Sequence, residues 1–414
     1  MTPISGASGV ARRIAVVRHG RYPADSPVLR NVLALRDAGF SVDLICDHDP
    51  SRPRLEHVDG ITVLRTLMEH KRHSKARYLV EYAALPFMAA ATMLLRTTRG
   101  RYQYVEIDSP PDWLILAGMI PKLTGAKVTM YIFDNIPELL STDYGLSPYH
   151  PVMRVMLAAL RMGTRLSDGV IAPHRMVRHN LIRQGVQPEK IVAVVPNVPD
   201  ERVFLSHATA LGAHPRGDDA GFRLVTHGSL LKRYGIETLL EAVSLARADI
   251  PNLHLDILGD GNYRAHLEEI AASLDLRQHV SFLGMLPFTE VAPRLLQADV
   301  GVVPMWADFV PNKLMEYLAL GLPAISSDTA ALRLYLDDDA LCYVPAKDAR
   351  ALAGAIVMLY RDPARRAVLA ECGHQVFTEH LSWNRTRRDY LAVYGVVPPT
   401  GCIPEGRSSP TRPP

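Results

Sequence analysis

Short runs of β-branched and other apolar residues alternate with helical patterns along almost the whole chain, and this alternation constrains the fold most. One series of runs starts at Arg13–Arg18 and ends at 191–195, and a second starts at Phe222–His227 and ends at 341–344. Continuous apolar runs bounded by turns indicate strands buried on both faces, as in parallel sheets. The sequence therefore predicts an α/β protein with two doubly wound, Rossmann-like domains.

The length supports this division, because one hydrophobic core rarely grows beyond about 250–300 residues and this chain has 414. We expect an N-terminal domain over 1–200, with its core starting near residue 13, and a C-terminal domain over 201–396. Residues 199–221 are predicted to be a linker. A last helix at about 382–396 is expected to cross back to the N-terminal domain. The Pro-rich residues 397–414 are predicted to be a disordered tail.

Charge and cysteine content narrow the class of protein. A net charge of +3, spread over scattered basic residues, is too small to indicate a nucleic-acid partner. The four cysteines share no CxxC spacing, which fits a reducing compartment and neither a disulfide framework nor a zinc site. The first 13 residues lack an apolar signal-peptide core. We therefore expect a cytoplasmic protein.

One basic cluster could place the protein at a membrane. Residues 65–77 contain Lys71, Arg72, Lys75 and Arg77, and an apolar stretch follows over 78–95. The cluster fits either a solvated loop or a peripheral contact with an anionic membrane. The apolar stretch is marginal for spanning a bilayer, so a buried amphipathic helix is expected there.

A lysine in the first turn of a predicted helix is the most informative local feature. Pro311 precedes this helix and Gly321 ends it, while Lys313 stands where the helix dipole disfavours a cation. An anion bound by the helix amides and the ammonium together would explain the arrangement. A second cationic loop follows the strand that ends at His227, where Lys232 and Arg233 again precede a helix. Two such loops in one domain favour a diphosphate ligand.

Glycines mark a third loop of the same domain. The turn Gly259-Asp260-Gly261 follows a strand and lets backbone N–H groups approach a phosphate or ribose. The first domain has His19-Gly20-Arg21 after its first strand in place of GxGxxG, which argues against a dinucleotide oxidoreductase.

Carboxylates near strand ends give two further candidates. Asp134 and Glu138 follow a strand of the first domain and could act as acid/base groups or bind sugar hydroxyls, although Asp134 could also be a helix N-cap. Asp47 and Asp49 have the spacing of a metal-binding pair, but they lie away from the cationic loops. No metal is expected.

The order of these motifs resembles glycosyltransferase family 4, retaining enzymes of the GT-B fold that use nucleotide-sugar donors. The resemblance covers roughly residues 13–396, and each piece alone is weak. In the C-terminal half it rests on His227-Gly228, Tyr234-Gly235, Gly259-Asp260-Gly261, Phe282-Leu283-Gly284, residues 308–316 and residues 321–325. In the N-terminal half it rests on Arg21-Tyr22-Pro23, Arg30, residues 109–112, Asp134, Pro137-Glu138 and residues 195–197.

The resemblance implies a GT-B architecture with the two domains facing a cleft and a site for a nucleoside-diphosphate sugar. Glu316 would bind the ribose and Asp308, shorter than the usual Glu, the donor sugar. The implied catalytic residues are Asp134, Glu138, Arg233, Lys313 and Asp308. The implied donor-binding residues are Gly20, His227, Gly228, Ser229, Lys232, Gly259, Asp260, Gly261, Met285, Leu286, Asn312, Leu314 and Glu316.

Three positions depart from the family pattern. Ser229 and Tyr234 replace the usual Arg and Lys of the cationic loop, and Phe133 stands where a His often precedes the aspartate. Lys232, Arg233 or Lys313 would then have to supply the missing charge.

We therefore expect a metal-independent retaining glycosyltransferase that uses no cofactor and transfers a hexose-like sugar to a saccharide or lipid-linked acceptor, in cell-surface polysaccharide or glycolipid synthesis. The alternatives are a non-catalytic GT-B protein that binds a sugar nucleotide or a partner enzyme, and a nucleotide-sugar epimerase.

Overall fold

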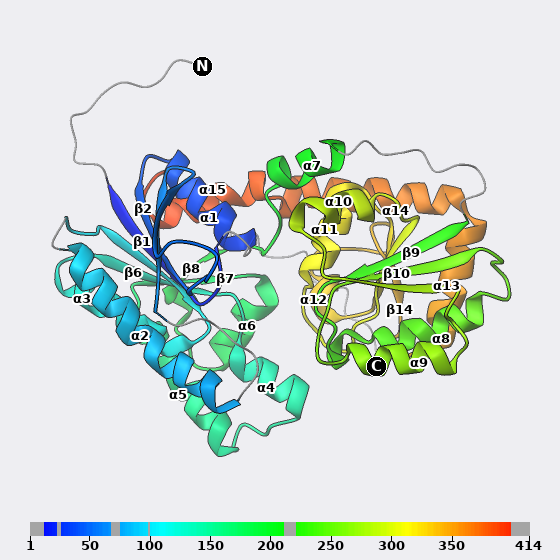
Figure 1. The fold of residues 1–414 in the computed structure, drawn as a ribbon, viewed down its shortest axis with the longest axis horizontal. Coiled ribbons are helices and arrows are strands. Elements are labelled where there is room, and N and C mark those ends of the chain that lie inside the picture. Colours follow the sequence, from blue (N-terminus) through cyan, green and yellow to red (C-terminus); the bar gives the residue numbers. More distant parts are fainter. Residues whose placement is uncertain (1–11, 23–25, 68–74, 98–99, 211–220, 399–414) are drawn as a thin grey trace, which may run out of the picture. The chain divides into compact units, whose positions relative to one another are not determined.

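The computed structural model describes residues 12–22, 26–67, 75–97, 100–210 and 221–398, and these ranges form two compact units. The first unit runs to Asn197 and takes up the chain again from Arg387. The second unit comprises Val198–Thr386. The expected tail and most of the basic cluster at 65–77 lie outside the described residues. Figure 1 labels the helices and strands of both units.

The first unit is built on an eight-stranded sheet with the order β3-β4-β2-β1-β5-β6-β7-β8, parallel except for the β3–β4 pair. Its strands are β1 (Arg13–Arg18), β2 (Ser41–Cys46), β3 (Leu55–Val58), β4 (Ile61–Arg65), β5 (Tyr104–Ser109), β6 (Lys127–Ile132), β7 (Gly169–Ala172) and β8 (Ile191–Val194). Its helices are α1 (Ser26–Asp37), α2 (Lys75–Thr97), α3 (Met119–Leu123), α4 (Ile136–Tyr144), α5 (Pro151–Leu166) and α6 (Arg175–Arg183), with a 3-10 segment at Asp112–Gly118.

The second unit is built on a six-stranded parallel sheet with the order β11-β10-β9-β12-β13-β14. Its strands are β9 (Phe222–His227), β10 (Leu253–Leu258), β11 (Val280–Gly284), β12 (Val300–Val303), β13 (Ala324–Ser327) and β14 (Cys342–Val344). Its helices are α7 (Glu201–Ala210), α8 (Ile236–Ala246), α9 (Arg264–Ser273), α10 (Phe288–Leu295), α11 (Asn312–Leu320), α12 (Ala330–Arg333), α13 (Ala349–Arg361) and α14 (Pro363–Val376). Helix α15 (Trp383–Val393) begins in this unit and ends in the first.

The predicted α/β class and parallel sheets are confirmed, since every strand expected from the apolar runs is present within one or two residues. Two elements were missed. Strand β3 is a half-exposed edge strand with the pattern LEHV, which carries no continuous apolar run. Helix α7 lies within the stretch interpreted as a linker, where the composition rich in Ala and Asp concealed it.

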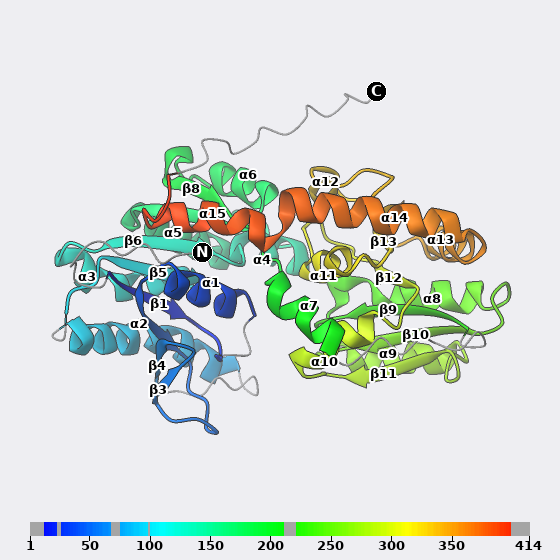
Figure 2. The same ribbon diagram turned by 90° about the horizontal axis from the view of Figure 1, so that it is seen from above.

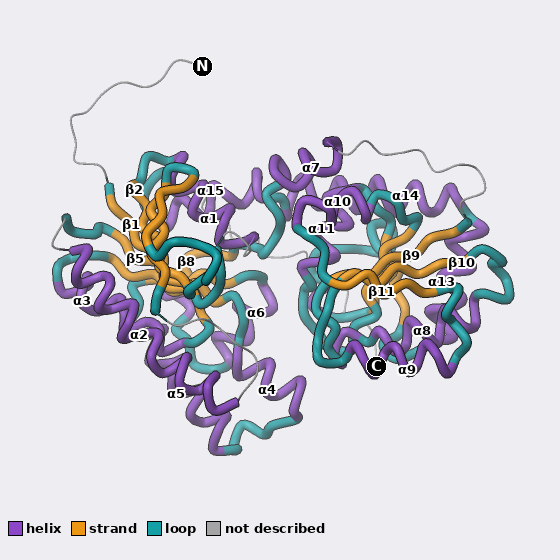
Figure 3. Tube along the Cα trace, viewed as in Figure 1, coloured by secondary structure: helices purple, strands orange, loops and turns teal. Residues whose placement is uncertain are grey.

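Both sheets reverse their strand order at one point, and this point locates the ligand site of an open α/β sheet. In the second unit, the order runs outward from β9 to β11 on one side and from β12 to β14 on the other. Ligands bind beyond the carboxyl ends of the strands at such a switch point. The loops that leave β9 and β12 contain the two segments around Arg233 and Lys313. Figure 3 distinguishes these strands from the loops and helices around them.

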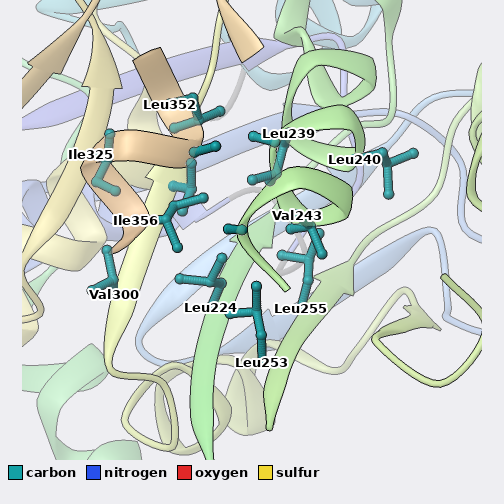
Figure 4. Packing of buried hydrophobic residues seen from close by; sticks show 14 of the residues in the cluster. Leu224, Leu239, Leu240, Val243, Leu253, Leu255, Val300, Ile325, Leu352 and Ile356 are labelled. Carbon is teal, nitrogen blue, oxygen red and sulfur yellow. The ribbon is translucent and has the colours of Figure 1, made fainter. Parts of the chain in front are cut away.

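A continuous apolar core holds the second sheet rigid beneath those loops. Figure 1 shows α8 and α9 on one side of the sheet and α10 and α11 on the other. Figure 4 shows side chains of β9, β10, β12 and β13 packing against those of α8 and α13, with Leu224, Leu255, Leu239 and Ile356 fully buried. Fully burying one such side chain contributes roughly 1.5–3 kcal/mol. The loops at the switch point therefore begin at strands that the core holds in place.

Helix α2 departs from the expected buried amphipathic helix. Leu85, Ala89 and Met93 are buried in the first unit's core, as expected for an inward face. The exposed positions, however, are also apolar, and Phe87 and Leu95 are 73% and 70% exposed. They recur at helical spacing along one outer stripe: Ala83, Phe87, Ala91, Leu94 and Leu95. No helix in the described ranges is both long and apolar enough to cross a membrane.

Helix α15 is anchored in the first unit by a buried carboxyl group. Tyr390 and Tyr394 both donate hydrogen bonds to Glu106 Oε2 on β5, the first at 2.9 Å. All three side chains are fully buried. Burial raises the pKa of Glu106, because removal from water disfavours the ionised form. Figure 2 shows α15 following α14 near the end of the chain.

Candidate active site

His227, at the end of β9, orients the carboxylate of Glu316, the residue that the family resemblance assigns to the ribose. His227 Nε2 lies 2.7 Å from Glu316 Oε2, and its Nδ1 lies 3.1 Å from the Tyr317 hydroxyl. Burial raises the pKa of Tyr317 far above its usual range, so its hydroxyl stays protonated and can donate to Nδ1. Nε2 then carries the proton that Glu316 accepts. The other carboxylate oxygen of Glu316 has no hydrogen-bond partner among the described residues and can accept from a ligand.

Lys313 lies on the same helix, one turn before Glu316, and is almost entirely buried. Its residue is 7% exposed, and burial lowers the pKa of its ammonium to about 8, although the nearby Glu316 carboxylate acts in the opposite direction. Within the described part of the chain the ammonium makes no hydrogen bond and no ion pair. A buried charge without a partner is costly, and sites of this kind cluster where ligands bind.

The ring of Tyr234 lies against both cations that the sequence singled out. Lys313 Nζ is 4.5 Å from the ring centroid, and the Arg233 guanidinium carbon is 5.3 Å from it. Tyr234 is itself held by an edge contact with Phe309, at 5.8 Å between centroids. The residue that departs from the family pattern therefore joins the loop after β9 to the loop after β12.

Close backbone approaches explain the glycines of the site. A Cβ on Gly259, whose φ is +134°, would lie 1.9 Å from the carbonyl oxygen of Gly228. A Cβ on Gly261 would lie 2.2 Å from the carbonyl oxygen of Leu230. The turn after β10 therefore packs directly against the loop after β9, and any larger side chain would separate them. The result is a backbone-lined surface next to Lys313, whose Cε would contact a Cβ at Gly228.

The remaining predicted donor-site residues differ in how exposed their side chains are. Those with exposed side chains border the loops and are available to a ligand: Ser229, Lys232, Asp260, Met285 and Asn312. Leu286 is half-buried in the loop after β11. Leu314 is fully buried in the core, so its backbone and not its side chain is the part that could reach a ligand.

Asp308 is exposed but already has one structural role. Its Oδ1 accepts a hydrogen bond of 2.7 Å from the Ala331 backbone N–H at the start of α12, next to the N-cap Thr329. One carboxylate oxygen therefore secures the loop after β12 to α12. The contact of Asp308 with a sugar, which the resemblance implies, stays a prediction.

The first unit carries the expected acceptor-side residues after β6. Asp134 is exposed, and it is not the N-cap of α4, because Asn135 occupies that position. Glu138 accepts hydrogen bonds from the side-chain amides of Asn135, at 3.2 Å, and Asn180, at 3.0 Å. These two amides orient the Glu138 carboxylate.

Phe133 and Gly20 have clear structural surroundings in the same unit. Phe133 stacks on Tyr131 with centroids 4.2 Å apart, and the Arg18 guanidinium lies 4.2 Å from its ring centroid. The Gly20 carbonyl accepts from the Asp47 backbone N–H at 3.0 Å. The carbonyl group of Gly20 is therefore part of the connection between β1 and β2.

The candidate metal pair does not converge on a common point. Asp47 Oδ2 lies 2.8 Å from His19 Nδ1. Asp49 accepts hydrogen bonds from the Ser51 backbone N–H and hydroxyl, at 3.0 and 2.7 Å, which lower the pKa of its carboxyl group. No group of three or more His, Cys, Asp or Glu side chains in the described ranges could hold a metal ion.

Two contributors escaped the sequence interpretation. Tyr317 was not singled out, and Tyr234 was interpreted only as a missing cation. The Tyr317 ring packs closely against Gly301 on β12, where a Cβ would lie 2.5 Å from the ring. Such a contact between distant residues is not readable from one sequence.

Two doubly wound α/β units, each built on a largely parallel sheet, are the architecture of GT-B proteins. Residues 27–197 match the family model described as glycosyl transferase 4-like domain, and residues 221–362 match the one described as glycosyl transferases group 1. The chain belongs to the glycosyltransferases of family 4, as its motifs suggested, and has the GT-B fold.

Individual relatives agree with this assignment. A lipopolysaccharide core biosynthesis glycosyltransferase, LpsE of Rhizobium meliloti, is 30% identical over 42% of this chain and 50% of its own. The chain spans about half the length of the first curated relatives it matches. Sucrose-phosphate synthase of Thermosynechococcus elongatus superposes with a TM-score of 0.74 at 20% identity, covering 93% of this chain and 98% of that one. HepE of Anabaena in complex with UDP gives 0.69 at 14% identity, covering 93% and 100%. These two likenesses show the fold.

Proposed function

We propose that this protein is a retaining, metal-independent glycosyltransferase that transfers a sugar from a nucleoside-diphosphate sugar to an acceptor hydroxyl. The observation that carries the proposal is Lys313, a buried ammonium without a hydrogen-bond partner in the described residues, at the switch point of the second sheet. A diphosphate would supply the missing counter-charge. Family membership supports the reaction class, and HepE was crystallised with UDP.

The departing diphosphate is the charge that the site is built to stabilise. Lys313, Arg233 and the backbone amides at the start of α11 would bind its oxygens as the glycosidic bond to the donor breaks. One preorganised donor of this kind contributes about 2.7–4 kcal/mol to transition-state stabilisation. The free oxygen of Glu316 would accept a ribose hydroxyl, and Asp308 would contact the sugar.

The acceptor would bind through the first unit. The bond from the anomeric carbon to the diphosphate oxygen breaks as the acceptor oxygen attacks the same face, which retains the configuration. The acceptor proton moves to the departing phosphate oxygen, so no protein base is required. Asp134 would orient the acceptor hydroxyl, with Glu138 held by its two amide donors behind it.

A lipid-linked or cell-surface saccharide is the proposed acceptor class, and α2 supports it. LpsE is named for lipopolysaccharide core biosynthesis. The apolar outer stripe of α2 follows a basic sequence and would lie in the interface of an anionic membrane. Replacing Phe87, Leu94 and Leu95 with Ser should reduce sedimentation with anionic liposomes, while Leu245→Ser, an exposed leucine on α8, should not. Equal sedimentation of both variants would remove the membrane from the proposal.

A non-catalytic donor-binding protein is the second candidate. Ser229 is exposed and uncharged where the family usually has Arg, and Phe133 is packed under Arg18 where a His is usual. A thermal-shift screen with UDP, GDP, ADP and their sugars tests both candidates, because a ligand that binds the folded state raises its stability by mass action. Stabilisation with hydrolysis or transfer of the sugar supports the enzyme. Stabilisation without either reaction supports the binding protein, and no stabilisation contradicts both.

A further inference from the structure

The two charged side chains of α11 could have paired with each other, and they do not. Lys313 and Glu316 are three residues apart, a spacing at which opposite charges on a helix are neighbours. Glu316 instead directs Oε2 to His227, at 2.7 Å. The Lys313 ammonium lies 4.5 Å from the centroid of the Tyr234 ring. Both supporting residues belong to the segment from the end of β9 to the following loop.

An aromatic ring beside an ammonium group leaves its N–H donors available, whereas a carboxylate does not. The face of a Tyr ring attracts a cation through its quadrupole, and a desolvated contact stabilises it more than an exposed one. The ring accepts no strong hydrogen bond, so the three N–H donors of the ammonium stay available. A carboxylate at the same place would occupy one of them and would repel a diphosphate.

We propose that Tyr234 is a positioning residue that keeps the Lys313 ammonium charged and separate from Glu316 before the donor binds. This inference rests on the proposed function, because the ligand it serves is the donor diphosphate. Tyr234 thereby compensates for the loop cation that it replaces: it adds no charge, but it keeps the charge of Lys313 in the buried site. His227 has the matching role for Glu316.

The charged and titratable side chains near Lys313 come from α11, from the end of β9 and from the loop after β9. Glu316 lies on its own helix and Arg233 on the loop after β9, while His227 is engaged with Glu316. Burial, the largest cause, lowers the Lys313 pKa to about 8. Removing the ring removes an attraction for the cation, so the pKa should fall further. Removing only the Tyr234 hydroxyl group should leave the Lys313 pKa unchanged.

The direct test is the pKa of Lys313, measured by NMR on protein labelled with 13C-lysine, with the resonance assigned through Lys313→Arg. Tyr234→Leu should lower this pKa by about one unit, and Tyr234→Phe should leave it unchanged. Tyr234→Met serves the same purpose if the Leu variant does not fold. Tyr343→Leu is the matched control, because it removes a ring that lies 3.6 Å from the Arg333 guanidinium carbon elsewhere in the unit.

A second measurement separates this inference from the proposed function. Binding of UDP and GDP should weaken as pH rises through the Lys313 pKa, and in Tyr234→Leu this decline should begin about one unit lower than in the wild type. A shifted pKa in a protein that binds no nucleoside diphosphate would contradict the donor site and leave the positioning role intact. Nucleotide binding with the same pKa in wild type and Tyr234→Leu would overturn the role of Tyr234.

Discussion

A buried carboxyl group of the first unit and a buried ammonium of the second have different kinds of partner. In the first unit, buried or oriented carboxyl groups have partners within the unit: Tyr390 and Tyr394 donate to Glu106, and Asn135 and Asn180 donate to Glu138. In the second unit, the buried Lys313 lies against the face of the Tyr234 ring and makes no hydrogen bond or ion pair with any residue that the structure describes. Glu106 thus has two hydrogen-bond donors, whereas Lys313 is in contact with an aromatic ring and makes no hydrogen bond within the described residues.

This difference supports the proposal that Lys313 binds an anion. A satisfied network stabilises the fold and gains little from a ligand, whereas an unpaired buried charge costs stability until a ligand arrives.

The largest effect is expected for turnover. Lys313→Met should lower kcat at least a hundredfold, because it removes a preorganised donor to the leaving diphosphate. Lys347→Met is the control, since the Lys347 ammonium also lies over an aromatic ring, that of Trp306 at 5.1 Å, but outside α11. A loss below threefold in the Lys313 variant would remove the diphosphate assignment.

The same substitution should stabilise the protein in the absence of ligand. With a folded-state pKa of about 8 against 10.5 unfolded, a charged Lys313 costs the fold about 1–3 kcal/mol at neutral pH. The unfolded chain binds more protons between these values, so wild-type stability rises toward that of Lys313→Met as pH increases from about 8 to 10.5. Urea unfolding at pH 7 and pH 10 measures the difference; equal stability of both proteins at pH 7 contradicts it.

A substitution of a buried ionisable residue in the first unit should change stability in the opposite direction. Glu106→Ala should destabilise the protein by about 1–3 kcal/mol, because two buried Tyr hydroxyls lose their acceptor. Glu106→Gln keeps an acceptor oxygen and should cost less. The same unfolding experiment measures both variants. A Glu106→Ala protein as stable as the wild type would show that the network anchoring α15 is unimportant.

A smaller effect is expected on the acceptor side. Asp134→Asn should lower kcat/KM for the acceptor about tenfold, the ordinary value of one orienting interaction of about 1.4 kcal/mol. Its affinity for the donor nucleotide, measured by calorimetry, should not change. Weaker nucleotide binding in this variant would move Asp134 from the acceptor to the donor.

Removal of divalent metal should have no effect. Lys313 and Arg233 are proposed to supply the charge that a metal would otherwise supply at the diphosphate. Activity should be the same before and after treatment with EDTA. A loss that magnesium or manganese restores would return Asp47 and Asp49 to consideration.

Much of the fold was readable from the sequence, because buried parallel strands leave continuous apolar runs. Lys313 could be singled out from the sequence as well, because it stands where a helix dipole disfavours a cation. Tyr234 was not readable, since its role depends on a contact with a residue 79 positions away, the separation from Lys313. The outer face of α2 was misjudged because one apolar segment gives the same composition whether one face or both are buried.

The central claim is that an unpaired Lys313 binds the donor diphosphate, and calorimetry tests it most directly. UDP, GDP and ADP should be titrated at pH 7 into the wild type, Lys313→Met and Lys347→Met. At least one nucleotide should bind the wild type and Lys347→Met equally, and bind Lys313→Met at least tenfold more weakly. Equal affinity for all three proteins would contradict the account.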